Sequence, residues 1–146
     1  MKSWLYSPLK ILMLMVFSLL ASVGCANSEN DLSAPEAFEK VKAGELLLVD
    51  IRTPGEWRQT GVASGAQTID MTSKTFAQDL LAAMDGNADA PVALICRTGN
   101  RTTHTQRALA KAGFTQVYNV KEGMAGSFAG PGWLQRGLPV EAWTGP

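Results

Sequence analysis

Residues 91–101, PVALICRTGNR, decide the fold class of this chain. The first six of these residues form an apolar run without a charge, which is typical of a strand buried on both faces of a parallel sheet. Residues 102–112 follow a short polar loop and have the pattern of a helix that ends at Gly113. A buried strand that leads directly into a helix is the repeating unit of a parallel α/β sheet.

Further strands are predicted on both sides of this unit. Residues 46–51 form an apolar run of strand length apart from Asp50, residues 116–120 are a further predicted strand, and residues 66–70 are an additional candidate. Strands that alternate with helices imply crossover connections and a parallel order. The sequence therefore predicts an α/β fold in which a parallel sheet is flanked by helices within a single domain.

Two more helices are predicted from their end signals. Residues 33–36 (SAPE) combine a capping box with a proline in the first turn, and Gly44 ends the helix that they begin. Residues 76–84 have helical spacing, and Ser73 is the candidate cap of this helix. Residues 123–146 are rich in glycine, proline and tryptophan, so we expect irregular cover over the sheet.

Composition limits the possible functions. The chain has 146 residues and a formal net charge of zero, with 13 basic and 13 acidic side chains. This balance argues against a nucleic-acid-binding protein, whose domain is usually strongly basic. Two cysteines, Cys25 and Cys96, are too few for a disulfide scaffold, and the single histidine, His104, argues against a metal site rich in Cys and His. We expect no metal and no cofactor.

The N-terminus has the three parts of a bacterial signal peptide. Two lysines and no acid precede an apolar run at residues 11–23, which is shorter than the roughly 20 residues that a spanning helix needs. Residues 22–25 (SVGC) resemble a lipobox, which implies that Cys25 is lipidated and becomes the mature N-terminus. The alternative is ordinary cleavage after Ala26, which releases a soluble periplasmic protein.

These signals divide the chain into three parts. We expect a signal peptide at residues 1–24, a polar tether at residues 25–31 and the folded domain at residues 32–146. Both processing routes export the domain. We therefore expect it at the periplasmic face of a bacterial membrane, held there by lipid on Cys25.

Cys96 ends the central strand at the edge where open α/β sheets bind ligands. In the loop that follows, Gly99 and Asn100 tolerate a positive φ, so the main chain can curl and point its N–H groups at one centre. Together with the N-terminus of the next helix, such a loop forms an anion cradle. A cysteine in this cradle is favoured as the thiolate, which is its reactive form.

The charges around this loop suit an anionic substrate. Residues 91–120 contain no Asp or Glu, whereas Arg97, Arg101, Arg107 and Lys111 are basic. The alternative interpretation is structural, because a free cysteine at the end of a buried strand is often only a packing residue. The glycine- and arginine-containing loop favours the reactive interpretation.

Several motifs resemble one known family. Residues 96–101 (CRTGNR) resemble the active-site loop of rhodanese-type sulfurtransferases, and residues 49–57 (VDIRTPGEW) resemble the first signature of that family. Further motifs follow in the family's order, at residues 113–114 (GF), 117–119 (VYN), 122–124 (EGM) and 137–141 (GLPVE). The resemblance extends over about residues 31–142.

The resemblance implies a reaction and its site. Cys96 accepts a sulfane sulfur from a small anionic donor such as thiosulfate, becomes a persulfide and passes the sulfur to cyanide or a thiol. The implied residues that hold the donor and the persulfide are Arg97, Thr98, Gly99, Asn100 and Arg101.

Two other functions are weighed against sulfur transfer. In a sulfur-binding or sensing module, the persulfide forms on Cys96 and is handed to a protein partner without significant turnover. A phosphatase is the second, because some phosphatase loops also pair a nucleophilic cysteine with an arginine. Those loops place five residues between the two, and four lie between Cys96 and Arg101, which argues against a phosphatase.

The chain departs from the family pattern at two places. Residues 61–66 (GVASGA) carry Val62 where the family often has a histidine, so the packing near the site differs. Residues 126–133 (GSFAGPGW) are longer than the usual tail and are placed to shape the entrance to the site.

Several other polar and aromatic residues are interpreted as structural. We expect Asp50 to bond loop amides, and Arg52 and Glu56 to pair and fix the turn before the following tryptophan. His104 is expected to be a solvated helix residue rather than a general base. Packing is the default for the tryptophans Trp57, Trp133 and Trp143.

Overall fold

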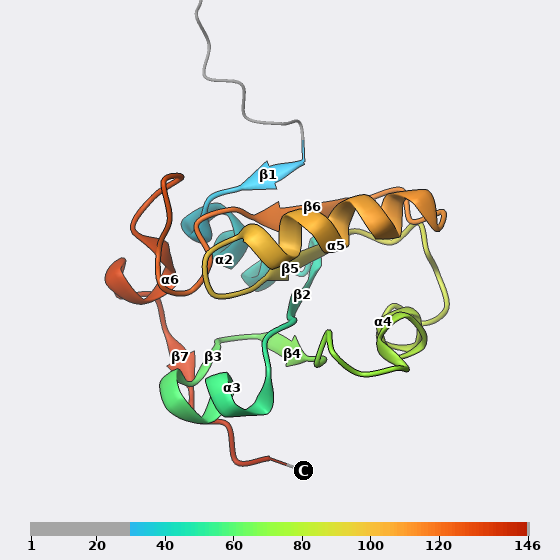
Figure 1. Cartoon of the computed structure of the whole chain (residues 1–146). Coiled ribbons are helices and arrows are strands. Elements are labelled where there is room, and N and C mark those ends of the chain that lie inside the picture. The colour runs from blue at the N-terminus through green and yellow to red at the C-terminus, as the bar shows by residue number, and fades with distance from the viewer. Residues whose placement is uncertain (1–29, 146) are drawn as a thin grey trace, which may run out of the picture.

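The computed structural model describes residues 30–145 (Figure 1). The strands are β1 (Asp31–Leu32), β2 (Leu47–Asp50), β3 (Val62–Ala63), β4 (Ala66–Thr68), β5 (Val92–Ile95), β6 (Val117–Val120) and β7 (Val140–Glu141). The helices are α2 (Ala34–Lys42), α3 (Pro54–Thr60), α4 (Phe76–Ala83), α5 (Asn100–Lys111) and α6 (Gly132–Gln135). The expected signal peptide and the lipidation site Cys25 lie outside the described residues.

Within residues 30–145, the central sheet has five strands in the order β1-β6-β5-β2-β4, and each neighbouring pair is parallel. β5 is the middle strand, and its Leu94 pairs with Val49 on one side and Asn119 on the other. Because the strands run parallel, their carboxyl ends share one edge of the sheet. The predicted α/β class is confirmed, and β3 and β7 add a small antiparallel pair beside the sheet.

The two faces of the sheet pack against different helices. Alternate residues of a strand point to opposite faces, so the fully buried β5 contributes to both. On the face covered by α4 and α5, Val49 and Leu94 pack with Leu80 and Leu109. On the face covered by α2 and α6, the core includes Leu48, Ala93, Ile95, Ala37 and Trp133. This double burial explains why β5 has no polar residue at alternate positions.

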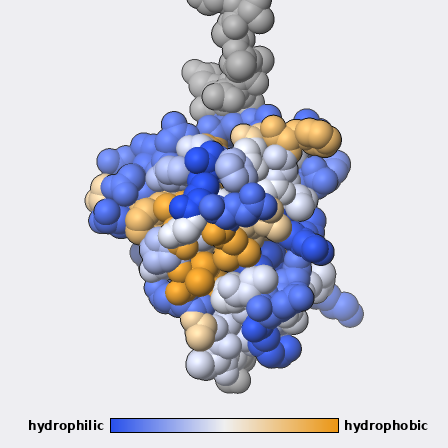
Figure 2. Space-filling model, turned by 90° about the vertical axis from the view of Figure 1, so that its left-hand side faces the viewer, coloured by the Kyte–Doolittle hydropathy of each residue, from blue (hydrophilic) through white to orange (hydrophobic). Residues whose placement is uncertain are grey.

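One side of the molecule presents apolar residues to solvent. On the side where α6 and β7 lie, apolar residues gather in the middle of the surface and hydrophilic residues surround them (Figure 2). Among the described residues, Phe128 and Val140 are the large apolar side chains that are exposed. No helix within residues 30–145 is both long enough and apolar enough to cross a membrane.

The predicted starts of α2 and α4 are confirmed, whereas the cap of α4 and the start of α5 differ from the prediction. The capping box before α2 is confirmed, because the Ser33 N–H donates to the Glu36 carboxylate at 2.8 Å. The prediction that Ser73 caps α4 is wrong. Thr75 is the N-cap, and the Ser73 hydroxyl instead accepts from the Thr75 N–H at 3.2 Å within the preceding turn. α5 begins at Asn100, two residues earlier than predicted.

Five short elements were not predicted: β1, α3, β3, α6 and β7. α3 follows the first signature, and its N-terminus is closed by the Glu56 carboxylate, which accepts from the Thr53 N–H at 3.1 Å. α6 and β7 lie within residues 123–146, where irregular cover was expected, so that prediction is wrong in part. β1 begins at Asp31, the last residue of the expected tether, and pairs with β6.

Candidate active site

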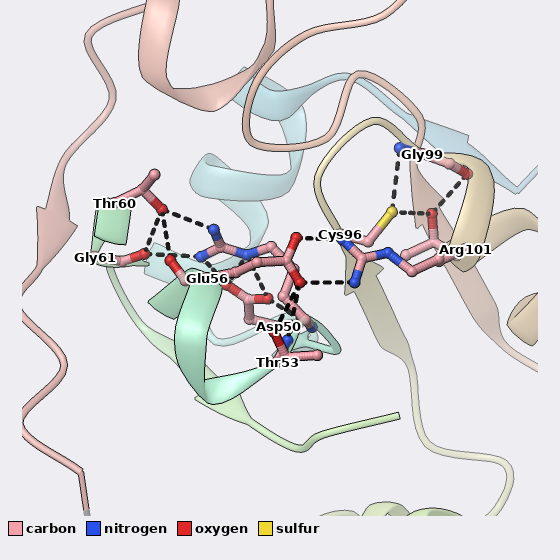
Figure 3. Close-up of polar contacts among 10 residues, drawn as sticks. Asp50, Thr53, Glu56, Thr60, Gly61, Cys96, Gly99 and Arg101 are labelled. Carbon is pink, nitrogen blue, oxygen red and sulfur yellow. Dashed lines mark hydrogen bonds and ion pairs between the residues drawn. The ribbon is translucent and has the colours of Figure 1, made fainter. Parts of the chain in front are cut away.

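Cys96 follows β5 at the carboxyl edge of the sheet and precedes the first turn of α5 (Figure 3). β5 is the central strand, and the neighbouring Asp50 of β2 pairs with Ile95, the residue before the cysteine. Cys96 is 1% exposed and packs in the core on the α5 face. The thiol is therefore buried beneath the loop between β5 and α5 rather than exposed on the surface.

The Cys96 sulfur receives a main-chain N–H from its own loop. The Gly99 N–H donates to Sγ at 3.2 Å, and the Thr102 hydroxyl lies 3.5 Å from the same atom (Figure 3). The Thr102 hydroxyl also donates to the Gly99 carbonyl oxygen at 2.9 Å. The Gly99 N–H is therefore a hydrogen-bond donor aimed at the sulfur atom from within the loop that follows it.

The other amides of the loop have no acceptor in the part of the chain that the structure describes. Within residues 30–145, no acceptor is bonded to the main-chain N–H of Arg97, Thr98, Asn100 or Arg101. The carbonyls of Cys96 and Arg97 are held by the N–H groups of Met124 and Ala125, at 2.8 and 2.9 Å. In a trans peptide the next N–H points opposite to the carbonyl, so the amides of Arg97 and Thr98 point away from that segment. The loop thus offers several donors to an anion.

Two glycines allow the loop to approach the segment after β6. Gly99 has φ +83°, and a Cβ on it would lie 2.2 Å from the Lys121 carbonyl oxygen. Gly123 has φ +67°, and a Cβ on it would lie 2.5 Å from the Arg97 carbonyl oxygen. Because neither position has space for a side chain, the curled loop depends on glycine at both.

The two arginines of the loop have different surroundings. Arg97 is exposed and forms no ion pair within residues 30–145. Arg101 is two-thirds buried, and its Nη1 and Nη2 donate to the two Glu56 oxygens at 2.8 and 2.5 Å (Figure 3). This hydrogen-bonded pair lowers the pKa of Glu56 to about 2 and raises the pKa of Arg101. Arg101 thereby joins the start of α5 to α3.

The expected pair between Arg52 and Glu56 is wrong. Arg52 is buried and donates to the Asp50 carboxylate from Nε at 2.9 Å and from Nη2 at 2.7 Å. The same guanidinium donates to Thr60 Oγ1 and to the Gly61 carbonyl oxygen, each at 2.7 Å. Asp50 also accepts from the Arg52 N–H at 3.0 Å, which confirms its predicted bond to a loop amide. Arg52 therefore anchors the end of α3, whereas Glu56 faces the active-site loop.

The remaining residues of interest take structural positions. His104 is an exposed residue of α5, and Val62 is buried in β3, where the family often has a histidine. The three tryptophans pack as predicted: Trp57 against Trp143 with ring centroids 5.2 Å apart, and Trp133 edge-to-face with Phe38 at 5.7 Å. Among residues 30–145, no three His, Cys, Asp or Glu side chains gather in a way that could hold a metal ion.

Sequence reasoning missed two contributors to the site. Thr102 was assigned only to the helix, although a β-hydroxyl in a first turn often bonds a main-chain carbonyl and so stays near the preceding loop. Glu56 was assigned to Arg52. The signal for its true position is the spacing from Thr53 to Glu56, which is that of a capping box and predicts the start of a helix.

Comparisons with known proteins agree on one family. A sequence model described as a rhodanese-like domain matches residues 33–128. An uncharacterised protein of Rickettsia prowazekii is 30% identical over 99 residues, which cover 64% of this chain and 80% of that protein. A thiosulfate sulfurtransferase of Actinobacillus pleuropneumoniae is 27% identical over 111 residues, which cover 76% of this chain and 92% of that protein. The structure of the polysulfide-sulfur transferase homodimer of Wolinella succinogenes superposes with a TM-score of 0.60 at 26% identity. The superposition covers 78% of this chain and 79% of that one.

Proposed function

Since the chain belongs to the rhodanese-like domain family, we propose that it is a sulfurtransferase that carries sulfur as a persulfide on Cys96. Its relatives include proteins named for thiosulfate and polysulfide sulfur transfer. The observation that carries the proposal is a cysteine at the start of a loop that aims one main-chain donor at its sulfur and leaves its other amides without an acceptor in the described residues. The Gly99 N–H reaches Sγ at 3.2 Å, and the other loop amides have no acceptor within residues 30–145.

The first half-reaction loads the cysteine. The Cys96 thiolate attacks the outer sulfur of an anionic donor such as thiosulfate, an Sγ–S bond forms, and the donor's S–S bond breaks. Sulfite leaves with the electron pair of that bond. The loop amides hold the donor's charge in place, and the exposed Arg97 attracts it from solvent.

The second half-reaction unloads the cysteine. A nucleophile such as cyanide or a thiolate attacks the outer sulfur of the persulfide, and the bond to Sγ breaks. The Cys96 thiolate leaves and again lies beside the Gly99 N–H, which stabilises its charge. The four residues between Cys96 and Arg101 close a tight ring, which suits a single sulfur atom better than a phosphoryl group.

A second candidate is a sulfur-binding module without significant turnover. It is favoured by the burial of Cys96, which is 1% exposed and so offers little access to a free acceptor. In this case the persulfide is released only to a docked partner protein.

Rapid-mixing and steady-state assays of the purified protein separate these candidates. We expect thiosulfate to load one sulfur per chain and cyanide to remove it over many cycles, with loss of both steps in Cys96→Ser. Loading without multiple turnover would support the binding module. Hydrolysis of aryl phosphates as fast as sulfur transfer would instead support a phosphatase.

We also propose that the domain is exported and lipid-anchored at the periplasmic face of a bacterial membrane. The support is the apolar run at residues 11–23 and the lipobox-like ending at Cys25. A fully acylated protein stays with membranes in high salt and leaves only with detergent. Fractionation of the full-length protein beside Cys25→Ala, with mass spectrometry of the mature N-terminus, tests this. An unmodified N-terminus at Asn27 and a freely soluble protein would support ordinary cleavage.

A further inference from the structure

The segment between β6 and α6 forms a second wall beside the active-site loop (Figure 1). It is bonded directly to that loop through Met124 and Ala125, whose N–H groups donate to the carbonyls of Cys96 and Arg97. A groove of about 500 Å³ lies between the two, and its lining residues are Thr98 and Asn100 on the loop and Gly126, Ser127 and Phe128 on the segment. Because Thr98 and Asn100 belong to the active-site loop, a molecule bound in the groove lies against that loop.

Hydrogen bonds hold the main chain of residues 126–130 in place, and Phe128 lies in this turn. Ser127 and Gly130 exchange two main-chain hydrogen bonds at 2.9 and 3.1 Å, and the Ser127 hydroxyl donates to the Lys121 carbonyl oxygen at 2.9 Å. Below this turn, the buried Glu122 carboxylate accepts from the Gly132 N–H at 2.9 Å. Gly130 has φ +158°, and a Cβ on it would lie 2.6 Å from the Glu122 carboxyl carbon. The turn is therefore braced from below and does not need to be ordered when a ligand binds.

Phe128 has no packing role within the described domain. Its relative exposure is 114%, so the whole ring stands in water at the tip of a braced turn. A small molecule in the groove covers one side of such a ring, whereas a protein segment can pack along it. Exposed aromatic side chains on rigid surfaces are frequent anchor points for protein partners.

The charges around the groove favour an acidic partner. Arg97 directly precedes Thr98 of the groove lining, is exposed and forms no ion pair within residues 30–145. Further along α5, Arg107 is likewise exposed and unpaired within the described residues. Glu122, the acidic residue within the segment, is paired with Arg136 at 2.7 Å. Residues 91–120 contain no acid at all. An approaching acidic chain is attracted to this side, and the attraction weakens with added salt.

We propose that this groove binds an acidic protein segment that carries the acceptor thiol beside an apolar side chain, and that Phe128 is the apolar contact. The inference rests on the proposed sulfur transfer through Cys96. The acceptor thiolate attacks the outer sulfur of the persulfide, the bond to Cys96 Sγ breaks, and the Cys96 thiolate leaves. The acceptor thus becomes the new persulfide and no further reactant is consumed.

The transfer test uses defined acceptors with the persulfide-loaded full domain. One peptide carries a cysteine beside a leucine and is flanked by aspartates, and its matched partner has lysines in place of the aspartates. Cyanide and glutathione serve as small acceptors. We expect the acidic peptide to be preferred at low salt, and Phe128→Ala to reduce kcat/KM for it roughly tenfold while cyanide transfer stays within about twofold. Val140→Ala is the control, because Val140 is the other exposed large apolar residue that the structure describes. This substitution should leave sulfur transfer to the peptide and to cyanide unchanged.

A binding test separates this inference from the proposed function. The acidic peptide with serine in place of cysteine is titrated into the wild type and Phe128→Ala by calorimetry, so that no sulfur transfer is needed. Weaker binding to the variant supports the inference even if Cys96 never carries sulfur. Equal binding and equal peptide transfer in both proteins, or glutathione as good an acceptor as the acidic peptide, would overturn it even if cyanide transfer is normal.

Discussion

Replacing Glu56 with glutamine tests how the active-site loop is held. Glu56 binds both terminal nitrogens of Arg101, 45 residues away in sequence, and also accepts from the Thr53 N–H at 3.1 Å. The glutamine amide has the same size and shape as the carboxylate but no charge. Its NH₂ group also places a hydrogen-bond donor against the guanidinium, which is itself a donor. We therefore expect Glu56→Gln to loosen the contact between α3 and α5 and to lower the free energy of unfolding.

The magnitude follows from the pKa of Glu56, which Arg101 lowers from 4.5 to about 2. A depression of this size corresponds to about 3 kcal/mol, and the carboxylate is 23% exposed, so solvent screening reduces the expected loss to about 1–2 kcal/mol. A carboxylate with a depressed folded-state pKa stabilises the fold fully above its unfolded pKa. This stabilisation is lost as the pH falls from about 4.5 towards 2. The difference between wild type and variant should shrink over the same range.

Urea unfolding followed by tryptophan fluorescence, at pH values from 7 down to 3, measures this difference. Glu39→Gln is the matched control, because Glu39 meets Lys42 in an exposed pair at 3.4 Å. An exposed pair of this kind contributes little, so the control should change stability by less than about 0.5 kcal/mol. A Glu56→Gln effect that is as small as the control, or that is the same at pH 7 and pH 3, would refute the reasoning.

Three further substitutions test the loop and its support. Gly99→Ala places a Cβ 2.2 Å from a main-chain oxygen and should abolish sulfur transfer and lower Tm, whereas Gly44→Ala, with φ +69° and open space, should lower Tm only slightly and keep activity. Arg101→Lys loses the bidentate contact with Glu56 of α3 and should reduce kcat/KM roughly tenfold, which corresponds to about 1.4 kcal/mol. Unchanged kinetics would show that this contact is not needed for sulfur transfer. Asp50→Asn leaves the buried Arg52 charge uncompensated and should cost about 3–5 kcal/mol in urea unfolding, and a loss below about 1 kcal/mol would contradict the assigned role of this pair.

The sequence predicted the centre of the fold because the relevant signals are local. The run PVALIC is buried on both faces of the sheet, and its position before a glycine-containing loop and a helix places Cys96 at the ligand-binding edge. The capping box at Ser33 was read correctly for the same reason, since its two partners are three residues apart. Such features depend on near neighbours in the chain.

The pairing of charges could not be read in this way. Arg52 and Glu56 have a spacing that suits a local pair, yet Arg52 turns inward to Asp50 and Glu56 reaches Arg101 in another part of the chain. Which of several acids a buried arginine selects depends on how α3 packs against the sheet edge, and that is a tertiary property. The close approach of Gly123 to the Arg97 carbonyl is also long-range. The spacing of residues in the sequence therefore could not predict that the segment after β6 supports the active-site loop.

The most direct test of the account is to find where the sulfur is carried. The purified domain is incubated with thiosulfate, desalted and digested under non-reducing conditions, and the peptides are analysed by mass spectrometry beside Cys96→Ser. We predict the added mass of one sulfur atom on the peptide that contains Cys96, its removal by cyanide and its absence in the variant. An unmodified Cys96 peptide after thiosulfate, or full sulfur transfer by Cys96→Ser, would contradict the proposal that Cys96 carries the sulfur.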